Sequence, residues 1–126
     1  YLNWHGNFSQ LDFKIISADK EDFVLSMGNK IDDLQGIKLN QSNFAVHLVY
    51  CDEFEKFCKF RINGIPTNKM YSPDVMNNER INTFDINEEY QLKINSVKFN
   101  QCDNYRFCNL GYEGYHLVNV SVEKKK

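Results

Sequence analysis

The residues of this chain best suited to chemistry are its four cysteines, which fall into two short and similar segments. The first segment runs from Cys51 to Cys58 and the second from Cys102 to Cys108. Each begins Cys-Asp, continues through an aromatic and then a basic residue, and ends Phe-Cys. Paired thiols of this kind can bind zinc, act as redox or nucleophilic groups, or form disulfides.

The spacing of the cysteines favours disulfides. Structural zinc sites usually use cysteines separated by about two to four residues, whereas six and five residues separate the two pairs here. A redox or nucleophilic thiol would need a Cys-x-x-Cys motif or a neighbouring base, and neither is present in the sequence. We predict local bridges, Cys51 with Cys58 and Cys102 with Cys108, with crossed pairing between the segments as the alternative. We predict no metal and no cofactor.

Both cysteine segments also place aromatic side chains beside charges. Phe and Tyr lose few rotamers on contact, which suits them to protein-binding surfaces. If each segment is the tip of a hairpin, the residues that bind a partner are Phe54, Glu55, Lys56, Tyr105 and Arg106. The alternative is that some of these rings fold back and cover the core.

Three sequons indicate a secreted or cell-surface glycoprotein. Asn7, Asn40 and Asn119 each lie two residues before a serine. Together with an even number of closely paired cysteines, they predict an oxidising compartment. The chain begins at Tyr1 without an apolar signal segment, which is typical of a mature or excised ectodomain. It also lacks the apolar stretch of about 18 residues that a membrane-spanning helix needs.

Length and charge exclude several classes of partner. A chain of 126 residues predicts one domain, 1–126. Its net charge of −2 argues against a general nucleic-acid or anionic-membrane surface. The basic run at the end belongs to a charged tail, 123–126, which we expect to be solvated.

Alternating apolar residues predict the strands that position these segments. The clearest runs are 11–15, 23–25, 44–50, 57–62, 90–94 and 118–122. After residue 94 the apolar phase slips by one residue, which predicts a β-bulge. The dipeptide Asn63-Gly64 predicts a tight turn, and 66–78 reads as a loop. If Val118 and Val120 face the core, Asn119 faces solvent, where it could carry a glycan.

These strands predict an all-β fold, specifically an antiparallel β-sandwich with two disulfides. The segment Ile86 to Ile94, with a Tyr inside a strand that follows a polar turn, resembles the late strands of immunoglobulin and fibronectin type III domains. The Trp-plus-bridge pattern of immunoglobulin domains is missing, so immunoglobulin-like, fibronectin-like and C2-like topologies all stay open.

We predict a non-catalytic domain that binds another protein in adhesion, receptor recognition or host–pathogen interaction. The histidines at 5, 47 and 116 are scattered, and no known catalytic motif is present. Two alternatives remain. Acidic clusters, such as Asp52 with Glu53 and Glu88 with Glu89, could bind Ca²⁺ in a C2-like module that also binds lipid. An exposed Trp4 could serve a carbohydrate-binding domain.

Overall fold

The chain folds into two β-sheets that lie face to face. The computed structural model describes residues 12–16, 19–28, 34–39, 42–101 and 115–125. Its elements are β1 (Phe13–Ile16), β2 (Lys20–Gly28), β3 (Leu34–Leu39), β4 (Ser42–Asp52), β5 (Phe57–Ile62), β6 (Ile65–Pro66), β7 (Met70–Tyr71), the short 3₁₀ helix η3 (Pro73–Val75), β8 (Thr83–Asp85), β9 (Tyr90–Gln101) and β10 (Tyr115–Lys124). This nearly all-β arrangement of two sheets confirms the sandwich-like class predicted from the alternation.

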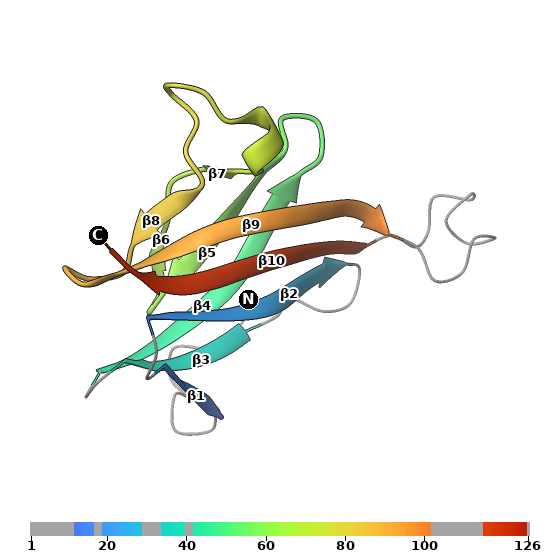
Figure 1. Cartoon of the computed structure of the whole chain (residues 1–126). Coiled ribbons are helices and arrows are strands. Elements are labelled where there is room, and N and C mark those ends of the chain that lie inside the picture. Colours follow the sequence, from blue (N-terminus) through green and yellow to red (C-terminus); the bar gives the residue numbers. More distant parts are fainter. Residues whose placement is uncertain (1–11, 17–18, 29–33, 40–41, 102–114, 126) are drawn as a thin grey trace.

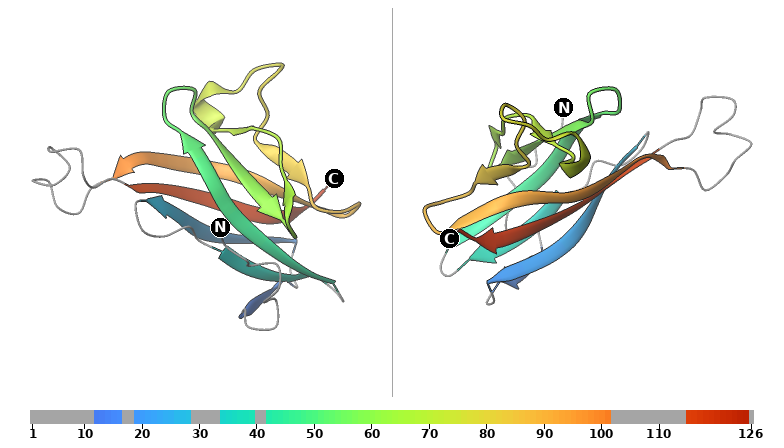
Figure 2. Two further views of the ribbon diagram at one scale, coloured as in Figure 1. Left: turned by 180° about the vertical axis from the view of Figure 1, so that it is seen from behind. Right: turned by 45° about the horizontal axis from the view of Figure 1, so that its top comes forward.

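The two sheets have different strand orders (Figure 1). One has the order β1-β3-β4-β5-β6, with β7 also paired to β5, and the other has the order β2-β10-β9-β8. Figure 2 shows β4 and β5 running at an angle across β9 and β10. Because sequence neighbours such as β1 and β2 belong to different sheets, the chain crosses between layers as it proceeds.

The prediction of a purely antiparallel sandwich is wrong at one edge, where β1 and β3 are parallel. Between them the chain passes through β2, which lies in the opposite sheet, so β1 and β3 point the same way. Gly36 on β3 permits their close approach. A Cβ atom at this position would lie 3.0 Å from the Asp12 carbonyl oxygen and 3.0 Å from Phe13 Cδ2.

The core fills the space between the inner faces of the two sheets. On β10 the valines at 118, 120 and 122 are fully buried, as the alternation predicts. Opposite them, Leu48 and Phe60 of the other sheet are also fully buried. A buried side chain of this size contributes about 1.5–3 kcal/mol, so these alternating positions supply much of the energy that holds the layers together.

Two local predictions from the sequence are confirmed. Asn63 and Gly64 have φ angles of 51° and 86°, as the tight turn between β5 and β6 requires. The pairing of β9 with β10 shifts between Ser96, which faces Asn119, and Ile94, which faces Val120. The extra residue left between them is Asn95, so the bulge lies where the apolar phase slips.

The structure contains two strands, β3 and β7, that the alternation of apolar residues did not predict. β3 has two adjacent buried residues, Gly36 and Ile37, which interrupts a simple alternation. Within 66–78, which the sequence predicted as loop, Met70 and Tyr71 form β7 against β5. A strand of two residues is too short to produce a periodic pattern.

Strand β10 extends into the residues that the sequence predicted as a C-terminal tail. Glu123 and Lys124 of the predicted tail are the last residues of β10. The Lys125 Nζ lies 3.4 Å from Asp85 Oδ2, and its backbone N–H donates to the Glu89 carbonyl oxygen over 2.7 Å. In the part of the chain that the structure describes, no helix has the length and apolar character needed to cross a bilayer.

Candidate protein-binding surface

The tip of the β4–β5 hairpin presents an aromatic side chain on a fixed backbone. Asp52 Oδ1 accepts hydrogen bonds from the backbone N–H of Phe54 over 2.8 Å and of Glu55 over 3.0 Å. This is an Asx turn, in which a side chain takes the place of a backbone acceptor. It leaves Phe54 with 90% of its surface exposed, the largest exposure among the large hydrophobic residues of the described ranges.

Lys56 closes the same turn in a backbone conformation that is unusual for lysine. Its φ angle is 62°, in the left-handed region that costs a residue with a Cβ roughly 1 kcal/mol or more. Contacts to the segment after β7 hold it there. Lys56 Nζ lies 3.3 Å from Asp74 Oδ2, and its carbonyl oxygen accepts the Ser72 N–H over 2.9 Å. The Ser72 hydroxyl in turn hydrogen-bonds Asp74.

A row of three aromatic rings supports this tip from below. The Phe57 ring centroid lies 6.0 Å from that of Tyr50 and 5.6 Å from that of Tyr71, and both pairs are tilted. Such tilted contacts are the favourable geometry for aromatic pairs. Phe57 is buried at 4% exposure, whereas Tyr50 remains 47% exposed. Of the two phenylalanines in this cysteine segment, one therefore covers the core and the other projects into solvent.

Two cations lie over the aromatic row. Lys69 Nζ is 4.7 Å from the centre of the Phe57 ring, and the Arg80 guanidinium carbon is 5.2 Å from that of Tyr71. Both distances are within cation–π range. A second Asx turn holds the Arg80 backbone, since Asn77 Oδ1 accepts its N–H over 2.9 Å.

These residues form one end of the molecule, which we call the Phe54 surface: Tyr50, Phe54, Lys56, Lys69, Tyr71 and Arg80. The hairpin tip and the segment around η3 lie side by side in both Figure 1 and Figure 2. Besides rings, the surface therefore displays positive groups.

The carboxylates of the loops near this surface are held in the charged state. Hydrogen bonds from the Glu55 and Phe54 backbone lower the pKa of Asp52, against a smaller opposing effect of desolvation. The Ser72 hydroxyl lowers the pKa of Asp74, helped by Lys56. Both groups are therefore anionic at neutral pH and act as fixed acceptors within the turns.

Cys51 and Cys58 lie directly opposite each other across β4 and β5. Both are buried, and their side chains are in contact as free thiols, so the predicted bridge is not confirmed. The hydrogen bond to Cys51, and then burial, raises the pKa of the Cys58 thiol. Cys58 is therefore protonated at neutral pH and a poor nucleophile. The other predicted pair, Cys102 with Cys108, lies outside the described residues.

Three of the five predicted binding residues are described, and two of them, Phe54 and Lys56, belong to the Phe54 surface. Phe54, Glu55 and Lys56 lie together on the β4–β5 tip, whereas Tyr105 and Arg106 lie outside the described residues. Sequence reasoning missed Tyr50, Lys69, Tyr71 and Arg80. Of these, only Tyr50 carried a sequence indication, because it directly precedes Cys51. Lys69 and Tyr71 reach the tip through the pairing of β7 with β5, and Arg80 lies over the Tyr71 ring.

His116 lies near the start of β10 and contacts the end of β9, its neighbour in the same sheet. Its Nδ1 accepts the Asn100 N–H over 3.1 Å, and its ring packs edge-on against Phe99 at 5.4 Å between centroids. Desolvation lowers the pKa of His116, and the charge of Glu53 on the β4–β5 tip opposes that shift. The tip therefore lies near the place where β9 ends and β10 begins.

The other predicted site residues are distributed as follows. Asn119 lies on the outer face of β10 between two buried valines, as predicted, and its Oδ1 accepts a hydrogen bond from Asn95 Nδ2 over 3.0 Å. Asn7 and Asn40 lie outside the described residues. Within the described ranges, the carboxylates, histidines and cysteines form no group of three or more that could hold a metal ion.

Comparison of the chain with protein-family models, with curated proteins and with solved structures finds no match in any of the three. The site is therefore interpreted from its own geometry.

Proposed function

We propose that this chain is a secreted or cell-surface glycoprotein domain that binds another protein through the Phe54 surface, without catalysis. The observation that carries the proposal is Phe54 itself, which is 90% exposed on a tip held by two backbone hydrogen bonds to Asp52. An apolar ring left in water has a free-energy cost that contact with a partner removes. A pre-ordered tip also loses little entropy on binding.

The surroundings of Phe54 indicate the chemistry of the partner. Tyr50 and Tyr71 present amphipathic rings of the kind that is enriched in binding hot spots. Lys69 places positive charge over the Phe57 ring, and Arg80 places it over the Tyr71 ring. A complementary partner has an apolar pocket for Phe54 with carboxylates opposite Lys69 and Arg80, because opposite charges steer association and fix orientation.

The proposal includes disulfides in the oxidised, secreted protein. Cys51 and Cys58 are register partners in adjacent strands, so a bridge between them would close the base of the tip without moving either strand far. We propose the same local closure for Cys102 with Cys108. Non-reducing peptide mapping tests both bridges against the crossed pairing.

Site-specific photocrosslinking tests the binding proposal. A photoreactive phenylalanine analogue is placed at position 54 of the full chain, and in a matched control at position 65. Ile65 is an exposed hydrophobic residue, 65% accessible, at the opposite end of β5. The labelled proteins are applied to intact cells and to secreted material.

The expected result is a discrete crosslinked protein from position 54 and none from position 65. Unlabelled wild-type chain should compete for this product, and the Phe54→Ala variant should not. Equal labelling from the two positions, or full competition by Phe54→Ala, would overturn the proposal. Within the described ranges no group of carboxylates that could hold Ca²⁺ is present, and Trp4, on which the carbohydrate-binding alternative rests, lies outside those ranges.

A further inference from the structure

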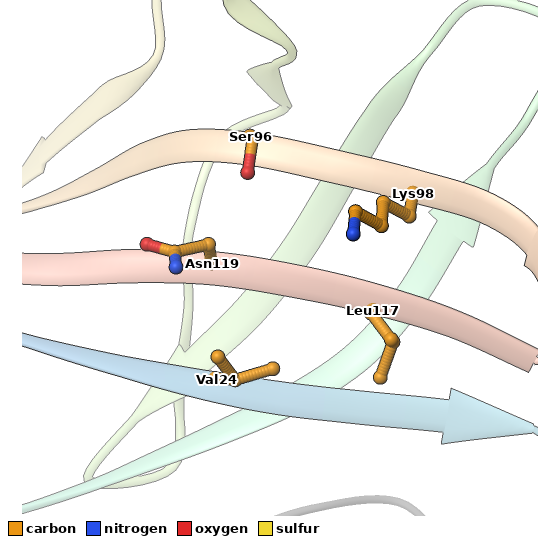
Figure 3. A pocket seen from close by; sticks show the side chains of 5 residues that line it. All are labelled: Val24, Ser96, Lys98, Leu117 and Asn119. Atoms are coloured by element: carbon orange, nitrogen blue, oxygen red, sulfur yellow. The ribbon is translucent and has the colours of Figure 1, made fainter.

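A shallow hollow lies on the outer face of the four-stranded sheet, over β2, β10 and β9 (Figure 3). It has a volume of about 200 Å³ and is lined by Val24, Ser96, Lys98, Leu117 and Asn119. Val24 is 54% exposed, and Leu117 is partly exposed. The hollow therefore combines two apolar side chains with a hydroxyl, an ammonium group and the acceptor asparagine of a sequon.

The side-chain amide of Asn119 is oriented by its neighbour. Asn95 is the extra residue of the β9 bulge, and its Nδ2 donates to Asn119 Oδ1 over 3.0 Å. This bond holds the oxygen of the amide on the side of β9. In Figure 3 the Asn119 nitrogen is drawn over β10, on the side of the amide that faces Val24. A group attached to this nitrogen would therefore start at the edge of the hollow.

We propose that the hollow is the seat of an N-linked glycan on Asn119, with the first N-acetylhexosamine covering Val24 and Leu117. The inference rests on the proposed passage of the chain through a secretory compartment. The acetyl methyl group and the C–H faces of the sugar fit the two apolar side chains. Its hydroxyls and amide carbonyl can hydrogen-bond the Ser96 hydroxyl and the Lys98 ammonium group.

The burial of Ser121 sets when the glycan must be added. Ser121 is the third residue of the sequon, and it has no exposed surface in the fold. β10 is also hydrogen-bonded on both sides, to β2 and to β9. An enzyme that must recognise the serine hydroxyl cannot reach it in the folded sheet, so transfer precedes the folding of β10.

The transfer itself uses a lipid diphosphate-linked oligosaccharide. The Asn119 side-chain nitrogen attacks the anomeric carbon of the first sugar and forms the new N–C bond. The C–O bond to the diphosphate breaks, the nitrogen loses one proton, and the lipid diphosphate leaves. No oxidant or reductant is involved.

The glycan would shield this face of the four-stranded sheet from a protein partner. A sugar seated between β2, β10 and β9 covers the exposed Val24 and keeps a protein partner off this face. The Phe54 surface at the end of the molecule stays uncovered. The two sites therefore divide the molecule into a shielded face and a binding end.

The first test is site occupancy. The full chain is secreted from eukaryotic cells, and Asn119 is examined by peptide mass spectrometry. We expect a glycan in the wild type and none in the Ser121→Ala variant, which keeps the Asn119 side chain. We also expect unglycosylated, refolded chain to resist glycosylation by microsomes when folded and to accept it when unfolded. An unmodified Asn119 in the secreted protein, or retention of the chain inside the cell, would overturn the inference.

The second test examines the seat. After trimming to a single N-acetylglucosamine, we expect nuclear Overhauser contacts from its acetyl methyl group to the methyls of Val24 and Leu117. We expect the trimmed protein to melt about 2–5 °C above the unglycosylated wild-type chain, and Val24→Ser to remove most of that difference. A glycan without these contacts would refute the seat. Photocrosslinking at position 54 does not depend on this result, so the two proposals fail separately.

Discussion

Asp52 Oδ1 accepts the backbone N–H of Phe54 over 2.8 Å, and this single bond links a fixed turn to the most exposed large hydrophobic residue described. Asp52 lies two residues before Phe54 in the chain, so its carboxylate restrains the backbone that carries the Phe54 ring. The same oxygen accepts the Glu55 N–H over 3.0 Å. An exposed ring on such a restrained backbone is prepared for contact before a partner arrives.

Removing the Asp52 acceptor should weaken partner binding without unfolding the domain. In Asp52→Ala the two backbone N–H groups lose their acceptor, and the tip gains freedom that binding must then remove. We expect roughly threefold to tenfold weaker competition in the crosslinking assay. Asp52→Asn keeps an oxygen in the same place and should compete like the wild type. If Asp52→Ala competes equally well, the turn does not pre-order the surface.

Replacing Lys56 should weaken partner binding without lowering the stability of the fold. Lys56→Gly relieves the positive φ angle and loses a surface ion pair to Asp74. Relief of the backbone contributes about 1 kcal/mol, and the solvent-exposed ion pair contributes little. We therefore expect the free energy of unfolding in urea to stay the same or rise by up to about 1 kcal/mol, while crosslinking from position 54 decreases. A large loss of stability would show that the side chain has a structural role instead.

The cysteine pair at the base of the tip should stabilise the oxidised protein. A local bridge that closes the loop between Cys51 and Cys58 contributes about 2–3 kcal/mol in the chain-entropy account. Urea unfolding of oxidised wild type against Cys51→Ala/Cys58→Ala should show this difference. The difference should shrink when both proteins are reduced. Equal stability of the oxidised proteins, with free thiols by mass, would refute the bridge.

Acidification should destabilise the domain through His116. Burial lowers the pKa of His116, so the folded state holds this proton less tightly than the unfolded chain does. The stability that neutral His116 contributes is fully present above the pKa of histidine in the unfolded chain, about 6.5. It is lost as the pH falls through the lower pKa of His116 in the folded state. Protonation also removes the acceptor that His116 Nδ1 offers to the Asn100 N–H. Melting temperature should therefore fall between about pH 7 and pH 5, and fall less in His116→Gln.

Gly36→Ala should loosen the parallel edge of the first sheet. The new Cβ atom would lie 3.0 Å from the Asp12 carbonyl oxygen, so β1 must move away from β3. Overpacking of this kind costs about 1–3 kcal/mol, measurable by urea unfolding. Ile15→Ala is the control, because Ile15 lies on β1 but is 67% exposed. A neutral Gly36→Ala would mean that β1 contributes little to the fold.

Much of the candidate site followed from local patterns. The cysteine spacing and the Cys-Asp start identified the segment that forms the β4–β5 tip, and Phe54 is exposed there. The rest of the Phe54 surface could not be predicted from local sequence patterns. Lys69, Tyr71 and Arg80 are separated from Phe54 by many residues. The pairing of β7 with β5 brings Tyr71 and its neighbour Lys69 to the tip, and Arg80 lies over the Tyr71 ring.

By itself, the sequence determined the features that depend on neighbouring residues. Alternation marked the inward valines of β10 and the outward Asn119, Asn63-Gly64 formed its turn, and a phase slip located the bulge at Asn95. These outcomes are local because a strand has a side-chain period of two and a turn needs particular φ angles.

Tertiary structure alone decided the long-range pairings. It made β1 and β3 parallel and brought Lys69 over the buried ring of Phe57. Such contacts depend on which sheet each strand joins, and that choice depends on packing in the shared core rather than on nearby residues.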